Sequence, residues 1–222
     1  RVPAREALRA RTTQLHVGQW VDRDALVAQL VAAGYARMAL VEERGEVAVR
    51  GGIVDVFPPQ RTHPVRIELT GDEVESIRDF DAASQRSQQR LGAVTLPPPR
   101  EIQLDRDLVI ERSAEIRKRA EEQGADARAT DETLDALLRG SLPPGSEALA
   151  PWIQAGVETV FEYLPADALV VIEEPGAAHE RLAHFGEETL QSFASAHAAG
   201  RVVAPPAELL LSAEAVERAL SS

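Results

Sequence analysis

The segment EVAVRGGIVDVFPP at residues 46–59 restricts the fold of this chain more than any other. Its β-branched and aromatic residues favour a strand, but the pair Gly51 and Gly52 interrupts it, and glycine weakens the interior of a strand. Valines occupy odd-numbered positions before this pair and even-numbered positions after it: Val47, Val49, Val54 and Val56. Side chains alternate across a strand, so one extra residue is needed to keep all four valines on the core side. We therefore predict one strand over 46–57 with a structural β-bulge at the two glycines.

The same alternation places charged side chains on the side away from the core. In 46–57 it directs Arg50 and Asp55 outward. In the next predicted strand, 64–70, it directs three more side chains outward: Arg66, Glu68 and Thr70. If the strands pair, this outward set lines one open face of a sheet. Such a face is either an ordinary solvated surface with weak cross-strand ion pairs or a surface that binds a partner, and the residues alone leave both interpretations open.

A glycine pair next to a strand can also belong to a phosphate-binding loop. A Walker loop needs GxxxxGK[ST], and a dinucleotide site needs GxGxxG at the start of a helix; neither pattern occurs around Gly51. The histidines lack the four-residue spacing of metal ligands on a helix, no nucleophile elbow is present, and the chain has no cysteine. We therefore expect no catalytic residue, no metal site and no cofactor site in this chain.

Charge divides the chain near residue 100. Residues 1–100 contain 14 basic and 13 acidic residues, whereas 101–222 contain 10 and 23. The three prolines of LPPPR at 96–100 predict a stiff connector at the same place. The net charge of −12 argues against a general nucleic-acid binder. No uncharged apolar run is long enough for a bilayer span, so we expect no membrane partner.

The two parts differ in their predicted elements. The first part has a helix over 22–34, with Asp22 as N-cap and Gly34 after its end, and strands over 46–57, 64–70 and 73–80, the last two joined by a tight turn at Gly71. This pattern predicts a small α+β domain with an antiparallel sheet over 15–97. The second part has predicted elements of both kinds: helices 105–123, 130–139, 177–198 and 213–220, and strands 157–164 and 168–174. Because the strand 168–174 is continuously apolar, we expect a partial parallel α/β layer whose other strands lie upstream of residue 1.

Several segments resemble one family. These are GEVAVRGGIVDVFPP (45–59), PVRIELTGDEVESIRDFD (64–81), SQRS (84–87), LPPGSEALAPWI (142–153) and VFEYLPADALVVIEEP (160–175). They resemble the UvrB-like module of bacterial transcription-repair coupling factors. UvrB has a similar strand pair, but the SQRS tail is similar to the coupling factors rather than to UvrB.

The resemblance implies a domain arrangement and a role. It implies that 1–14 is the tail of an upstream α/β half-domain, that 15–97 is an inserted UvrA-binding domain, and that 98–222 is the second α/β half-domain. The implied role is that of a non-catalytic adaptor, which recruits UvrA to lesion-stalled RNA polymerase in nucleotide excision repair in the bacterial cytoplasm. ATP and Mg²⁺ would belong to the motor of the parent protein, an ATP-dependent DNA translocase. RNA polymerase and DNA would contact other parent domains, and a C-terminal domain of the parent would mask the UvrA face.

The resemblance also implies which residues bind UvrA. Arg50 and Arg66 match the two arginines of the family's binding face. Glu68 follows on the same strand face as Arg66. Thr70 stands where the family has an aromatic residue. Two other functions stay open. The chain could be a piece of a UvrB-like ATP-dependent helicase or nuclease-complex protein with a nucleotide site completed upstream, or it could bind DNA through its arginine face.

Overall fold

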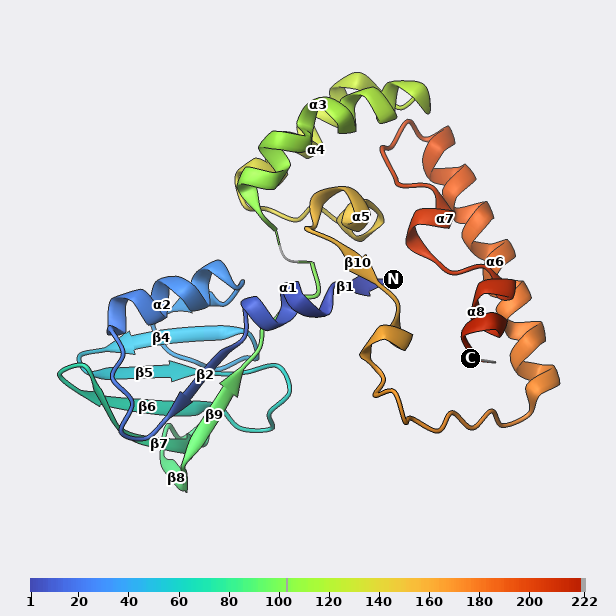
Figure 1. Cartoon of the computed structure of the whole chain (residues 1–222). Helices are drawn as coiled ribbons and strands as arrows, with labels where there is room; N and C mark the ends of the chain where they lie inside the picture. The colour runs from blue at the N-terminus through green and yellow to red at the C-terminus, as the bar shows by residue number, and fades with distance from the viewer. Residues whose placement is uncertain (103, 221–222) are drawn as a thin grey trace. The chain divides into compact units, whose positions relative to one another are not determined.

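The computed structural model describes residues 1–102 and 104–220. The chain divides into two compact units (Figure 1). Unit 1 comprises Arg1–Arg5 and Leu104–Ser222, and unit 2 comprises Glu6–Gln103. Each unit is described by itself below.

Unit 2 is built on a six-stranded sheet. Its elements in chain order, of which the first helix begins one residue before the unit, are α1 (Arg5–Ala10), β2 (Thr13–His16), α2 (Arg23–Ala32), β3 (Ala36–Met38), β4 (Glu46–Arg50), β5 (Ile53–Val56), β6 (Val65–Thr70), β7 (Glu73–Phe80), β8 (Ser87–Leu91) and β9 (Ala93–Leu96). The sheet has the order β3-β4-β5-β6-β7-β8, and β2 pairs separately with β9. All of these pairings are antiparallel except β3–β4. The predicted antiparallel sheet with one main helix is therefore confirmed for this unit.

Helix α2 covers one face of the sheet and closes the main core. The Asp22 side chain accepts a hydrogen bond from the Ala25 N–H, and Gly34 follows the helix with φ +107°, as the sequence predicts. Apolar side chains of α2 and of the strands form one buried cluster: Leu15, Leu26, Val27, Leu30, Tyr35, Val47, Val54, Val56, Val65, Ile67, Leu69, Val74, Ile77, Val94 and Leu96. This face of the sheet is therefore occupied by the core, and any binding surface of the sheet must lie on the opposite face.

The glycine pair forms a hairpin turn, so the prediction of one bulged strand over 46–57 is wrong. The segment is two antiparallel strands, β4 and β5, in which Arg50 pairs with Ile53 across Gly51 and Gly52. Gly51 has φ +59°, the left-handed value that the first central residue of a type II′ turn requires. In this hairpin an odd-numbered residue always faces an even-numbered one, so a chain reversal explains the change of valine parity without an extra residue.

A β-bulge is present elsewhere in the sheet. Opposite β6, Glu68 pairs with Ser76 and Leu69 pairs with Val74, so Glu75 of β7 has no opposing residue. The bulge lies close to the β6–β7 turn, where Gly71 has φ +60°, as predicted for that tight turn. Because a bulge adds one residue to one strand, the outward positions of β7 stay aligned with those of β6 on both sides of it.

Unit 1 is mainly helical. Its elements are β1 (Val2–Pro3), α3 (Arg106–Glu122), α4 (Ala127–Leu138), the 3₁₀ helix η1 (Ser146–Leu149), α5 (Ala150–Ile153), β10 (Val157–Glu158), the 3₁₀ helix η2 (Val160–Tyr163), α6 (Pro175–Ala198), α7 (Pro206–Leu209) and α8 (Ala213–Leu220). The four predicted helices correspond to α3, α4, α6 and α8. None of the helices in the described part of the chain is long and apolar enough to cross a membrane.

The predicted strands of unit 1 are largely absent from the described residues. Of 157–164 only the two residues of β10 form a strand, and they pair antiparallel with β1. Residues 168–174 form no strand, and Leu169 and Val171 are 87% and 80% exposed. The expected partial parallel layer is therefore not found in unit 1 within 1–102 and 104–220. An apolar run reports a tendency to be buried, but a strand forms only where a neighbour supplies ladder hydrogen bonds.

The turn geometry predicts that Gly52→Ala destabilises unit 2. A Cβ at this position would lie 2.6 Å from the backbone carbonyl oxygen of Leu69, so the two hairpins would have to move apart. We expect a loss of about 1–3 kcal/mol, the usual cost of overpacking, measured by amide hydrogen exchange of β4–β6. Gly92→Ala is the matched control, because no atom lies within 4 Å of its added Cβ. Equal protection in both variants would contradict the prediction.

Candidate functional site

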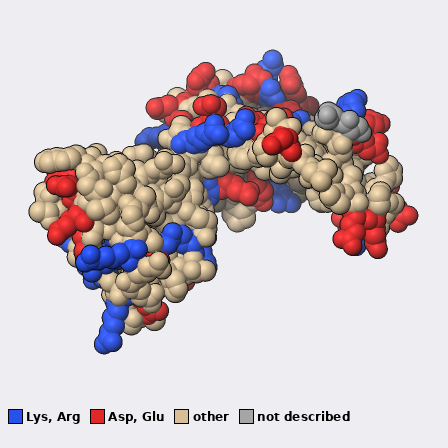
Figure 2. Space-filling model, turned by 60° about the horizontal axis from the view of Figure 1, so that its bottom comes forward, with Lys and Arg blue, Asp and Glu red and all other residues tan. Residues whose placement is uncertain are grey.

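The outer face of the sheet is the face opposite the main core. Strand register aligns its side chains in rows across β4 to β7, and the residues of this face are Ala48, Arg50, Ile53, Asp55, Arg66, Glu68, Thr70, Glu73, Ser76, Arg78 and Phe80. Figure 2 shows basic side chains gathered in one region of unit 2, at the left of the view; all of them are arginines, because the one lysine of the chain is Lys118. The sequence correctly predicted that Arg50 and Asp55 share this face.

Asp55 is the centre of the outer face. Its side chain is 1% exposed and accepts hydrogen bonds from Arg66 Nε (2.8 Å) and Nη2 (2.9 Å) and from Arg50 Nη2 (2.8 Å). Two parallel bonds to one guanidinium give a fixed geometry. The hydrogen bond that Arg66 donates to Asp55 raises the pKa of the Arg66 guanidinium above its ordinary value, so Arg66 remains charged although it is buried. One buried carboxylate therefore holds two arginines in place.

One half of the outer face is covered by other parts of unit 2, and Arg66 is buried in this covered half. Its guanidinium carbon is 4.6 Å from the centre of the Phe80 ring, and its Nη1 donates to the Gln85 carbonyl at 3.2 Å. Gln85 belongs to the SQRS segment, and its side-chain amide donates to the carbonyls of Ala82 and Val41. Phe80 and Val41 belong to a second buried cluster, which also contains Ala48 and Phe57.

The burial of Arg66 corrects one expectation. We predicted that Arg66 points into an open face, but only 11% of its side chain is exposed, because the SQRS segment and Phe80 cover it. The sequence pattern could not reveal this cover, since it depends on a loop that returns across the sheet from residues 84–87. Whether Arg66 contacts a partner stays a prediction; its observed contacts are those of a support for Asp55.

The other half of the outer face, called the open half below, contains Arg50, Glu68 and Thr70 and lies toward the Gly51 and Gly71 turns. Here 46% of the Arg50 side chain is exposed, and its hydrogen bond to Asp55 fixes its position. Glu68 accepts a hydrogen bond from the Ser76 hydroxyl, and one of its oxygens lies 3.6 Å from Arg78 Nη2.

Two further residues complete the description of this half. Thr70 is exposed, and its hydroxyl donates to the Glu75 carboxylate at 2.5 Å. Arg78 is partly exposed, and its buried Nε has no hydrogen-bond partner. Sequence reasoning missed Arg78, because its place beside Glu68 follows from a register that includes the β7 bulge.

The open half has the chemistry of a protein-binding surface. An arginine whose fork is pre-positioned by a buried carboxylate can donate further hydrogen bonds to a carboxylate of a partner. Within 1–102 and 104–220, no group of three or more His, Asp or Glu residues is placed to hold a metal ion. The open half is thus a strand surface that carries both acidic and basic side chains, among them Arg50, Glu68 and Arg78.

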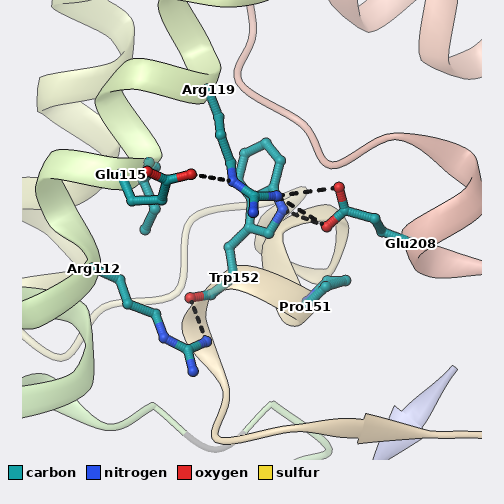
Figure 3. Close-up of a pocket in the computed structure, with 7 residues that line it drawn as sticks. Arg112, Glu115, Arg119, Pro151, Trp152 and Glu208 are labelled. Atoms are coloured by element: carbon teal, nitrogen blue, oxygen red, sulfur yellow. Dashed lines mark hydrogen bonds and ion pairs between the residues drawn. The ribbon is translucent and has the colours of Figure 1, made fainter.

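Unit 1 contains a pocket of about 200 Å³ between α3, α5 and α7 (Figure 3). Arg119 bridges Glu115 and Glu208, and Trp152 Nε1 donates to Glu208 at 2.7 Å. Arg112 donates to the backbone carbonyl of Trp152 at 3.2 Å. These groups bond to one another across three helices, so their evident task is to hold unit 1 together.

Comparison with known proteins gives matches for both units. Residues 13–101, which lie within unit 2, match the family model described as the UvrB interaction domain. A transcription-repair-coupling factor of Myxococcus xanthus is 36% identical over 97% of this chain and 18% of the relative. The corresponding values are 37%, 84% and 16% for the protein of Mycobacterium tuberculosis, and 32%, 79% and 15% for that of Escherichia coli. The chain thus spans less than a fifth of the length of these relatives.

The central position of Asp55 predicts a large effect of Asp55→Ala on stability. The change leaves the charge of Arg66 buried without its partner, and breaking a buried pair in this way costs about 3–5 kcal/mol. Asp24→Ala is the control, because Asp24 pairs with Arg23 on the surface, where an ion pair contributes less than about 1 kcal/mol. Urea unfolding, with hydrogen exchange of the β5 and β6 amides, measures both. An Asp55→Ala variant as stable as the unsubstituted chain would contradict this account of Asp55.

Proposed function

Because this chain is a homologue of a region of the transcription-repair-coupling factors and contains a UvrB interaction domain, we propose that it is an adaptor module. In this proposal unit 2 binds UvrA and thereby recruits repair proteins to RNA polymerase stalled at a lesion. The module itself performs no chemistry.

One observation carries the proposal more than any other. Arg50 lies on the open half of the outer face, half-exposed, with its guanidinium fixed by the buried Asp55 carboxylate. A pre-positioned arginine loses little conformational entropy on binding, and arginine is enriched among the residues that dominate protein interfaces. This face lies inside the segment that matches the UvrB interaction domain, which supports the assignment of the partner surface to unit 2.

The remaining elements of the proposal concern the parent protein. The chain spans less than a fifth of its relatives, so ATP, Mg²⁺, DNA and RNA polymerase are proposed to bind to other parts of the whole protein. The parent is proposed to act as an ATP-dependent translocase in the bacterial cytoplasm. The net charge of −12 disfavours DNA binding by this module, since phosphate contacts need basic surfaces.

Binding to UvrA tests the proposal, and Arg50→Ala tests the face. We expect the 222-residue chain to bind purified UvrA, and we expect Arg50→Ala to weaken binding by at least about 1 kcal/mol, about fivefold in Kd. Isothermal titration calorimetry measures both. Arg37→Ala is the charge-matched control, because Arg37 is an exposed arginine of the edge strand β3, outside the open half.

Two results would count against this function. Absence of UvrA binding at tens of micromolar by a folded chain would refute the adaptor role. Binding to UvrB with no binding to UvrA would assign the face to a different partner. Equal losses for Arg50→Ala and Arg37→Ala would leave the adaptor role but remove Arg50 from the interface.

A second prediction concerns masking in the parent protein. If a C-terminal domain of the parent covers the outer face, as we propose, it competes with UvrA at a high effective concentration because it is tethered. The isolated chain should then bind UvrA more tightly than the intact parent by about 1–3 kcal/mol, the usual size of an intramolecular coupling. Equal affinities, measured side by side at one salt concentration, would exclude masking.

A further inference from the structure

Trp20 is a large apolar side chain that the structure leaves on the surface, 74% exposed. It lies in the segment between β2 and α2, which runs along β7 and forms an isolated antiparallel bridge between Trp20 and Glu73. Val21 N–H donates to the Asp72 carbonyl at 2.7 Å, and Val74 N–H donates to the Gln19 carbonyl at 2.9 Å. These two bonds flank the bridge, which is the arrangement in which opposed side chains approach most closely.

Strand register places Trp20 on the outer face. Residues directly opposite each other in a sheet point to the same side, so Trp20 shares a side with Glu73. Glu73 in turn pairs with Thr70 of β6, which belongs to the open half. The neighbouring positions agree, because Val21 packs against the main core and Val74 is fully buried in it. Trp20, Glu73 and Thr70 therefore form one row at the edge of the open half.

The backbone that carries Trp20 is firmly held. Gly18 N–H donates to the Val74 carbonyl at 2.8 Å, and the Gln19 side-chain oxygen accepts from the His16 N–H at 3.1 Å. Gly18 has φ +83°, a conformation that suits glycine. A side chain on such a fixed backbone loses little entropy when it becomes buried by a partner.

We propose that Trp20 is the apolar anchor of the UvrA-binding face, an inference that rests on the adaptor function proposed above. Thr70, at the end of β6, has a small side chain that would bury little area in an interface, and its hydroxyl already donates a hydrogen bond to Glu75. Tryptophan and arginine are among the residue types most enriched at positions that dominate binding energy. This face presents Trp20 on a hydrogen-bonded backbone and Arg50 held by Asp55. The anchor residue and the charged residue are thus 30 residues apart in the sequence.

The separation of Arg50 and Trp20 determines which groups the partner surface needs. Arg50 and Trp20 lie on segments that are four strand spacings apart, about 19 Å across the sheet, and their rows are those of Glu68 and Thr70 on β6. This separation fits within an interface of about 800 Å² per partner. The partner needs a carboxylate opposite Arg50 and an apolar pocket for the indole at that separation. UvrA is the partner proposed for this surface.

The affinity of Trp20 variants for UvrA tests the inference. We expect Trp20→Ala to raise the Kd at least tenfold and Trp20→Phe to raise it less, because a ring is kept. Val31→Ala is the control, since Val31 is an exposed apolar residue of α2, the helix that covers the opposite face; it should change the Kd less than twofold. Circular dichroism melting of each variant verifies that folding is unchanged.

Fluorine NMR gives a second, independent reading. Labelling with 5-fluorotryptophan reports on both tryptophans of the chain, and Trp20→Phe assigns the two signals. On addition of UvrA, the Trp20 signal should lose its shift between H₂O and D₂O, while the buried Trp152 should change little.

The outcomes separate the two proposals. If Arg50→Ala weakens UvrA binding and the Kd of Trp20→Ala stays within twofold of that of the unsubstituted 222-residue chain, the anchor role is overturned and the adaptor function stands. If the unsubstituted chain does not bind UvrA, both proposals fail. If Trp20→Ala abolishes self-association of the chain in sedimentation and leaves UvrA binding unchanged, a second copy is the occupant and the anchor role is likewise overturned.

Discussion

The bonds of the buried Asp55 carboxylate are the interaction on which the outer face of unit 2 depends. Its oxygens accept three hydrogen bonds from two arginines, two of them from Arg66. A buried carboxylate is costly unless it is paired and hydrogen-bonded. Here both conditions are met by residues of adjacent strands, so the sheet register and the charge arrangement support each other. Arg66 stabilises the carboxylate from the covered side, and Arg50 extends from it to the solvent.

The two hairpin turns decide where the open half lies. β4 and β6 run in the same direction, since each is antiparallel to β5, so Gly51 and Gly71 lie at the same end of the sheet. The Leu69 N–H donates to the Gly52 carbonyl at 2.7 Å, which ties the two turns together. At the opposite end the SQRS segment and the second buried cluster cover the face. One sheet surface thus has a stabilising half and an accessible half.

The helices of unit 1 are joined by a different kind of interaction. Its α3, α5 and α7 are joined by charged and aromatic groups around Arg119, whose guanidinium carbon is 5.4 Å from the centre of the Trp152 ring. Its apolar run at 169–172 is exposed instead of forming the core strand that the run predicted. The family model matches residues 13–101, which lie within unit 2.

The sequence by itself determined the local structure of unit 2. The Asp22 cap and Gly34 gave the ends of α2, alternation placed Arg50 and Asp55 opposite the core, and Gly71 predicted its turn, because caps, turns and alternation depend on neighbours in the chain. Only the tertiary structure decided that the glycine pair reverses the chain, that Arg66 is covered, and that Trp20 joins the row of Thr70. Each of these depends on a partner far away in sequence: the Leu69 carbonyl against Gly52, the SQRS segment over Arg66, and β7 beside Trp20. Backbone hydrogen bonds and close packing select such partners in three dimensions, and a local pattern of residue types does not contain that choice.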